Sequence, residues 1–482
     1  MMQSKAPLWE ALIKNKKSTL AQLHIPGHRG GRAIPSEFLE AVGKEIFALD
    51  LTEVPGLDDL HNPEEAIADA LQLTSELFQA DQSFWLVNGT SCGLVALILA
   101  CCSNGSEIIL PRNAHRSVVS GLILSGAMPI YYQPEVIEPF ACLAGPSVEQ
   151  IERLLKKYKN VKAVLAVSPT YYGILGDLAA LAGVCHQAGV PLLVDEAHGS
   201  HLKFHPELPP DALGCGADAA VQSFHKTGGS LTQSSMLHIK GKRINRERLA
   251  DALRMVQSTS PSYLLMASLD LARRQLALQG KELLEETLGL ARYTRDRLSR
   301  LTGVKVLGQE HLGGDGAKCL DDTRLTISLL ELGLTGYQAA EILQHNYGVV
   351  VEMADYASVV LVISLGTTKK DCQRVIQAIE ELALTQTEQP VYFPKTLQLP
   401  LPVVILSPRE AWQREATDVP LEKSIGCICG ETVAVYPPGI PVVCPGEEIS
   451  PAVVDYLLEV RGQGIRVQGA RDGSLQQIRV IE

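Results

Sequence analysis

Two stretches of the sequence decide the fold, PLLVDEAHG at residues 191–199 and DAAVQSFHKTGG at residues 218–229. Each is a short apolar run followed by polar or glycine residues, a pattern typical of a buried strand and the loop at its carboxyl end. Asp195 ends the first run, and Lys226 follows the second. If these strands are neighbours in a parallel sheet, both side chains face one crevice at the carboxyl ends of the strands.

The same pattern recurs earlier in the chain, and helical patterns such as CGLVALILACC separate its copies. The further runs are SFWLVNGT (83–90), SEIILP (106–111), MPIYYQ (128–133) and VKAVLAVSP (161–169). Alternating strands and helices predict an α/β fold, with a mostly parallel sheet and helices on its faces.

Composition excludes several classes of protein. The chain has 482 residues with a net charge of −11, and 46% of them are hydrophobic, so it is a globular protein of more than one domain and not a nucleic-acid binder. The longest apolar run, residues 94–102, is far shorter than the roughly 20 residues that span a bilayer. The N-terminus shows no signal-peptide pattern, so we expect a cytoplasmic protein. The 11 cysteines show no zinc-type spacing, and we expect reduced thiols and no metal.

Changes in composition and in the apolar pattern along the chain predict five segments. Residues 1–60 form an N-terminal arm, with a helix from Pro7 to Lys14, and residues 61–300 form the large domain. Within the large domain, Asn62 and Pro63 predict the start of a helix, and a long helix is expected near 261–301. Residues 301–384 form a small α/β domain, the proline-rich stretch 385–402 is a linker, and residues 403–482 form a C-terminal α+β domain.

Asp195 and Lys226 indicate cofactor chemistry. Taken alone, such a pair is more often an ordinary salt bridge, but Ser223, His225 and two glycines surround Lys226 and suit a phosphate beside a reactive amine. In NGTS, Thr90 and Ser91 offer hydroxyls and amides at a helix N-terminus, although alone this is more often a plain N-cap. Together they favour pyridoxal 5′-phosphate. His115 is placed to stack on the cofactor ring, although a loop histidine is usually surface.

The sequence resembles the group III family of ornithine, lysine and arginine decarboxylases, which have the aspartate-aminotransferase fold, and in particular its short Bacillus-type branch. The motifs that carry the resemblance are HIPGHRGG, LDDLH, FWLVNGTS, PRNAHRS, SPTYYG, VDEAHGSH, SFHKTGGSLTQSS, STSPSYLLMASLDLAR, YPPGIPVVCPGE and IRVIE. These motifs follow one another in the fixed order of the family and extend over nearly the whole chain. The resemblance implies the pyridoxal-phosphate-dependent fold type I, with a mostly parallel seven-stranded sheet and flanking helices.

The resemblance also implies a role for each site residue. Lys226 would bind the cofactor covalently as an imine, Asp195 would keep the pyridine nitrogen protonated and His115 would stack on the ring. The phosphate region would be contacted by Thr90, Ser91, Ser223 and His225, with His198 close to the cofactor. Lys226, His198 or His225 would return the proton after CO2 leaves.

Thr259, in the motif STSPS, would reach the phosphate of a neighbouring subunit, which implies a homodimer or a higher homo-oligomer with active sites at the interface. The larger members of the family begin with a wing domain, whereas this sequence begins with the arm, which favours a small oligomer.

The expected reaction is decarboxylation of a basic amino acid, with arginine to agmatine in polyamine biosynthesis favoured, lysine second and ornithine third. An aminotransferase is the nearest rival, but Val362 stands where such enzymes carry a carboxylate-binding arginine. A protein that binds the cofactor without catalysis would be expected to lack Lys226 or Asp195. Acidic candidates for reading the distal end of the substrate, each of which could equally be a surface acid or a helix cap, are Asp58, Asp59, Glu352, Asp355 and Glu431.

Overall fold

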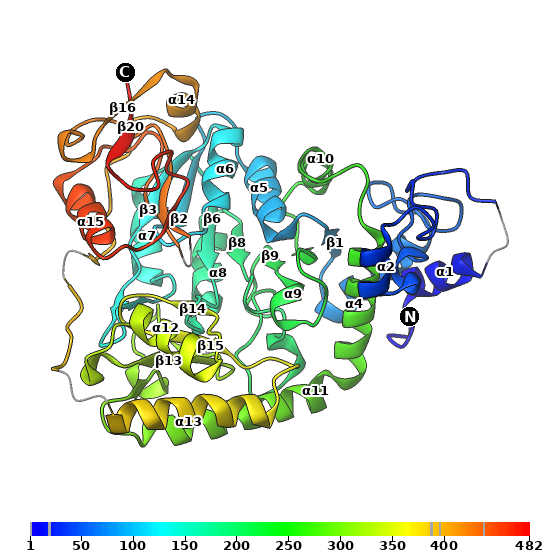
Figure 1. Cartoon of the computed structure of the whole chain (residues 1–482). Helices are drawn as coiled ribbons and strands as arrows, with labels where there is room; N and C mark the ends of the chain where they lie inside the picture. Colours follow the sequence, from blue (N-terminus) through cyan, green and yellow to red (C-terminus); the bar gives the residue numbers. More distant parts are fainter. Residues whose placement is uncertain (1, 18–20, 386–388, 395–396, 437–438) are drawn as a thin grey trace. The chain divides into compact units, whose positions relative to one another are not determined.

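The computed structural model describes residues 2–17, 21–385, 389–394, 397–436 and 439–482 (Figure 1). The described α-helices are α1 Pro7–Lys16, α2 Ser36–Val42, α3 Lys44–Phe47, α4 Ala66–Phe78, α5 Gly89–Cys101, α6 Ser117–Ser125, α7 Val148–Lys157, α8 Leu178–Gln187, α9 Phe224–Thr227, α10 Arg246–Val256, α11 Tyr263–Ser299, α12 Gly336–Tyr347, α13 Lys369–Thr385, α14 Pro408–Gln413 and α15 Pro451–Gly462.

The described strands are β1 Gln82–Leu86, β2 Glu107–Pro111, β3 Met128–Tyr132, β4 Val136–Ile137, β5 Cys142–Leu143, β6 Val161–Val167, β7 Ile174–Leu175, β8 Leu192–Asp195, β9 Ala219–Gln222, β10 Ser235–Ile239, β11 Lys305–Val306, β12 Cys319–Leu320, β13 Arg324–Ser328, β14 Met353–Ala354, β15 Val359–Val362, β16 Ala416–Pro420, β17 Val433–Val435, β18 Ile440–Val443, β19 Val467–Gln468 and β20 Gln477–Ile481. The expected long helix is α11, which runs from Tyr263 to Ser299.

The chain divides into two compact units, and each is described by itself. The first unit contains residues 1–100 and 195–283. Its strands lie in the order β1-β10-β9, with β10 antiparallel to both neighbours. Helix α5 is apolar on every side and is buried from Cys92 to Ile98, as expected of a helix inside a core. Gly93 lets helix α5 pack closely against β1 and β9, because a Cβ at this position would lie 2.7 Å from the Leu86 side chain and 2.8 Å from the Val221 side chain.

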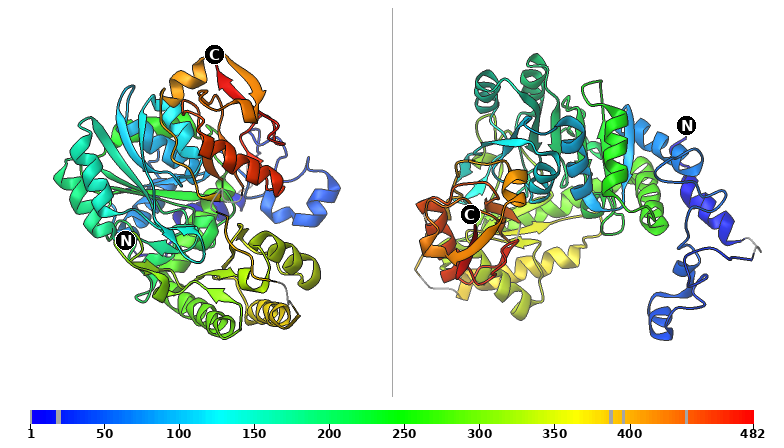
Figure 2. Two further views of the ribbon diagram at one scale, coloured as in Figure 1. Left: turned by 90° about the vertical axis from the view of Figure 1, so that its left-hand side faces the viewer. Right: turned by 90° about the horizontal axis from the view of Figure 1, so that it is seen from above.

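The second unit contains residues 101–194 and 284–482. Its largest group of strands has the order β8-β6-β2-β3, in which β2 pairs in parallel with both β3 and β6. An antiparallel sheet follows in the order β11-β13-β15-β14. The C-terminal part, orange to red in Figure 2, contains the pair β16-β20, the sheet β18-β17-β19 and helix α15.

Strand β2 with its parallel partners β3 and β6, and the helices between them, confirm the α/β fold with a mostly parallel sheet. The arm helix α1 covers the expected stretch and continues to Lys16. The expected start at Asn62 is wrong, since α4 begins at Ala66. The division into five segments stays a prediction, and residues 1, 18–20, 386–388, 395–396 and 437–438 of those segments lie outside the described residues.

Candidate active site

Lys226 and Asp195 both belong to the first unit. Asp195 is the last residue of β8, and Lys226 lies on the short helix α9, which starts two residues after β9 ends. The Lys226 Nζ lies 2.9 Å from Nε2 of His198, a buried residue. The structure therefore brings a lysine and an imidazole together at the strand ends where the sequence places them.

The Asp195 carboxyl is buried, and the Ala197 amide donates to its Oδ1 at 3.2 Å. Burial raises the pKa of Asp195, and the charge of Lys226 lowers it in part. A buried carboxylate with few donors is stabilised by a cationic N–H nearby, and a protonated pyridine nitrogen supplies one. Asp195 therefore fits the ring end of the expected cofactor.

The expected phosphate cradle is also in the first unit. Gly89, with φ of 73°, opens helix α5, and the Thr90 hydroxyl lies 3.1 Å from the hydroxyl of buried Ser223. Ser91 is exposed in the same turn. Backbone amides and hydroxyls at the start of a helix suit an anion, so these residues fit a phosphate.

His225 has a fixed ring orientation. Its Nδ1 lies 2.8 Å from the carbonyl oxygen of Ser234, which requires a proton on Nδ1. Burial lowers the pKa of His225, the Ser234 bond raises it in part, and Lys226 lowers it further. A neutral His225 therefore presents Nε2 as an acceptor.

The remaining expected site residues are Thr259 and His115. Thr259 is exposed in a bend after α10. His115 belongs to the second unit, where it is exposed after β2 and its Nδ1 lies 2.9 Å from the Ser117 hydroxyl. Their roles stay predictions.

Some of the acidic candidates have structural roles. The Asp58 carboxylate accepts backbone N–H groups of Glu64, Glu65, Ile67 and Ala68. Asp59 accepts the His61 amide at 2.8 Å, and Glu431 accepts the amides of Arg471 and Arg479. These bonds give Asp58, Asp59 and Glu431 a local structural function.

Glu352 accepts the Tyr171 hydroxyl at 3.2 Å in the second unit. Near it lies Arg324, which no local sequence pattern marks as a site residue. Arg324 is 1% exposed and pairs directly with Val362 across β13 and β15. Burial lowers its pKa, and the charges of Asp321, Glu352 and Tyr171 raise it in part. An arginine thus lies on the strand next to Val362. Val362 by itself therefore does not exclude a carboxylate-binding arginine at this place in the sheet.

The fold defines a chain of the pyridoxal-phosphate fold type I class. Family models describe it more closely. Residues 6–371 match the major domain of the Orn/Lys/Arg decarboxylases, and residues 375–469 match their C-terminal domain. The chain belongs to this family.

Individual relatives support the same family assignment. The chain is 40% identical to the arginine decarboxylase of Bacillus subtilis, over 100% of this chain and 99% of that protein. It is 37% identical to the arginine decarboxylase of Bacillus anthracis, over 100% of this chain and 98% of that protein. Among solved structures, the lysine decarboxylase of Francisella novicida matches with a TM-score of 0.84 and 25% identity, over 99% of this chain and 81% of that one.

Proposed function

We propose that the chain catalyses the pyridoxal-phosphate-dependent decarboxylation of a basic amino acid, with arginine the favoured substrate and agmatine and CO2 the products. The observation that carries the proposal is the contact of Lys226 with His198 beside the buried Asp195. Full-length similarity to two arginine decarboxylases supports arginine over lysine and ornithine.

When bound, the cofactor supplies an electron sink for the electron pair that CO2 leaves behind. Lys226 would hold the cofactor covalently, Asp195 would accept the pyridine N–H, and Thr90, Ser91, Ser223 and His225 would hold the phosphate. His198, 2.9 Å from the Lys226 amine, is placed to exchange a proton with it. Lys226, His198 or His225 would then return a proton to the substrate carbon.

We further propose a cytoplasmic homodimer or higher homo-oligomer, in which His115 stacks on the cofactor and Thr259 reaches the phosphate of the neighbouring subunit. Exposure of Thr259 supports this assignment, since its side chain is accessible to a second copy. Among the described residues, no helix has the length and apolar character required to cross a bilayer. A role in polyamine biosynthesis follows from the favoured product.

The test is an assay of the purified chain with added cofactor on arginine, lysine and ornithine. We expect CO2 and agmatine from arginine, and slower release of cadaverine or putrescine from the other two. Stoichiometric keto acid without CO2 would contradict decarboxylation, and equal rates on arginine and lysine would contradict arginine preference.

Two variants test the site itself. Lys226→Ala should lose turnover and the visible absorbance of the covalently held cofactor, whereas Lys242→Ala, at an exposed lysine of the first unit, should keep both. Asp195→Asn should lower kcat by about 10²-fold or more, the usual size of a lost proton-handling group. Full turnover in Lys226→Ala would overturn the mechanism.

A further inference from the structure

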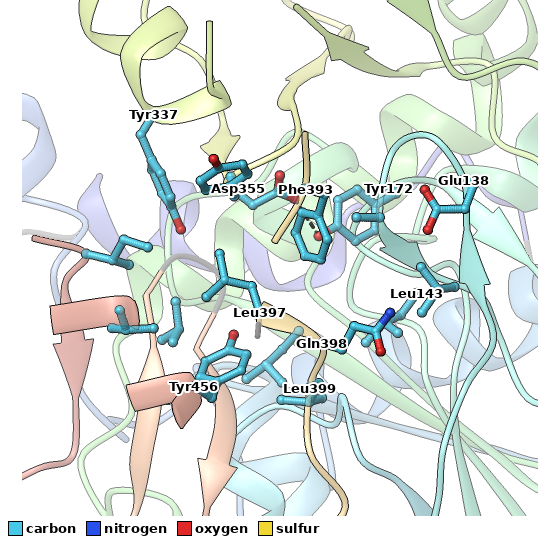
Figure 3. Close-up of a pocket in the computed structure, with 17 residues that line it drawn as sticks. Glu138, Leu143, Tyr172, Tyr337, Asp355, Phe393, Leu397, Gln398, Leu399 and Tyr456 are labelled. Atoms are coloured by element: carbon cyan, nitrogen blue, oxygen red, sulfur yellow. Dashed lines mark hydrogen bonds between the residues drawn. The ribbon is translucent and has the colours of Figure 1, made fainter. Parts of the chain in front are cut away.

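The second unit contains a pocket that none of the expected cofactor-binding residues lines (Figure 3). It encloses about 110 Å³, and we call it the aromatic pocket. Its walls include Tyr172, Tyr337, Phe393 and Tyr456, together with the acidic residues Glu138 and Asp355. Tyr337 comes from α12 and Tyr456 from α15, and Figure 3 shows both rings directed toward the middle of the pocket.

Asp355 is a half-buried acid of this pocket, and its hydrogen-bond partners among the described residues are all neutral. Its Oδ2 accepts the Tyr172 hydroxyl at 2.7 Å, and its Oδ1 accepts the amides of Ala357 and Ser358, each at 2.8 Å. Burial raises the pKa of Asp355, and these hydrogen bonds lower it in part. No lysine, arginine or histidine is among the described residues that line the pocket. The described part of the lining therefore offers negative charge and contains no cationic side chain.

Aromatic rings add to the attraction for a cation. The face of a tyrosine or phenylalanine ring attracts ammonium and guanidinium groups, most strongly where water is excluded. Burial raises the pKa of Tyr337 and of Tyr456, and the charge of Asp355 raises both further. The Asp355 carboxylate therefore interacts electrostatically with both tyrosine hydroxyls. The negative charge of Asp355 and the rings of Tyr337 and Tyr456 thus line the same pocket.

The rest of the lining is aliphatic and suits a short hydrocarbon chain. Leu397 and Leu399, from the predicted linker, and Leu143, from β5, supply part of this surface. The pocket volume of about 110 Å³ is several times the roughly 10–15 Å³ that a cavity needs to hold one water, so the pocket has room for more than one small chemical group. A ligand with a short alkyl chain and one cationic end therefore fits it in size and in character.

We propose that the aromatic pocket binds a small organic cation, an alkylguanidine or alkylamine, with its charge beside Asp355 and the rings of Tyr337 and Tyr456. This binding does not depend on catalysis. That the pocket senses the product of the reaction is a further step, and that step rests on the proposed function, because agmatine is an alkylguanidine of this kind.

The experiment uses N-propylguanidine, which has no primary amine to react with the cofactor, and N-propylurea as a neutral ligand of nearly the same shape. Calorimetric titration of the holoenzyme should show one propylguanidine per chain at the pocket and no binding of propylurea. Binding should persist in Lys226→Ala. Equal binding of propylurea, absence of binding, or loss of binding in Lys226→Ala would each overturn the proposal.

Variants of the pocket give the second half of the test. Asp355→Asn should weaken propylguanidine binding at least tenfold, while Asp455→Asn, an exposed acid next to Tyr456, should leave it unchanged. If Asp355→Asn does not fold, Leu399→Trp decides, because the larger ring fills part of the pocket and should also weaken binding at least tenfold. Unchanged binding in Leu399→Trp would contradict the proposal. Propylguanidine binding by a chain without decarboxylase activity would uphold this pocket and contradict the proposed function alone.

Discussion

Glu196 follows Asp195 in the chain and is 1% exposed. Its carboxyl accepts the Ala212 amide at 2.7 Å and the side-chain amide of Gln222 at 2.8 Å. Burial and then the charge of Asp211 raise the pKa of Glu196 to about 8. The Gln222 carbonyl lies 3.3 Å from His238, whose pKa burial lowers to about 3. Glu196, Gln222 and His238 thus form a chain of hydrogen bonds in the interior of the first unit.

The pKa of Glu196 predicts a pH dependence of stability. Between its ordinary value of 4.5 and about 8, the folded chain keeps a proton that the unfolded chain releases, so this group's contribution to the free energy of unfolding falls as pH rises. Glu196→Gln removes the titration and should flatten that fall, whereas exposed Glu247→Gln should not. Urea unfolding from pH 6 to pH 9 measures the slopes, and identical slopes in Glu196→Gln and the wild type would count against the shift.

Helix α4 owes its N-terminus to a residue eight positions before its first residue. Asp58, with φ of 71°, directs its carboxylate at four amides between Glu64 and Ala68. Burial alone would raise the pKa of Asp58, but these hydrogen bonds outweigh it and lower the pKa. The first amides of a helix have no partner within the helix, and Asp58 supplies one.

Asp58→Ala should therefore lower the free energy of unfolding by about 1–2 kcal/mol, the size of a lost N-cap. The contribution should also disappear as the pH falls below the ordinary carboxyl pKa of 3.8, since a lowered pKa stabilises the fold only while the group is ionised. Asp69→Ala, an exposed acid in the first turn of α4, serves as the control. Equal losses in both variants, measured by urea unfolding, would remove Asp58 from the capping role.

The start of α4 also shows where prediction from sequence ends. Asn62 and Pro63 form a good local start signal, but the acceptor that fixes the helix lies outside that window. Strands and long helices could be predicted because their apolar patterns are local. Lys226 and Asp195 could be predicted because each follows such a pattern. Arg324 could not, since its place beside Val362 depends on the register between β13 and β15.

One ion pair joins distant parts of the second unit. Arg112, after β2, donates to both carboxylate oxygens of Glu447 at 2.5 and 2.9 Å and to the Val442 carbonyl at 2.7 Å. Both side chains are 1% exposed. Burial would lower the pKa of Arg112, and the attraction of Glu447 outweighs it and raises the pKa. The buried ion pair therefore connects the C-terminal part to the residue that follows β2. Either charge would be strongly destabilising if it were buried without the other.

Glu447→Gln should lower the free energy of unfolding by about 3–5 kcal/mol, because a buried guanidinium loses its counter-charge. The double variant Arg112→Met with Glu447→Leu should recover much of that loss, since apolar groups of similar volume can replace a buried ion pair. Glu448→Gln, next in the chain, is the control. Urea unfolding of all four chains measures the effect, and a double variant as unstable as Glu447→Gln would contradict this account.

The separation of Arg112 and Glu447 along the chain has a consequence for biosynthesis. Glu447 leaves the ribosome 335 residues after Arg112, which takes roughly 20 to 70 s at ordinary bacterial rates of translation. During that interval the Arg112 guanidinium cannot pair with Glu447. We therefore expect the second unit to reach its native packing only after Glu447 has been synthesised.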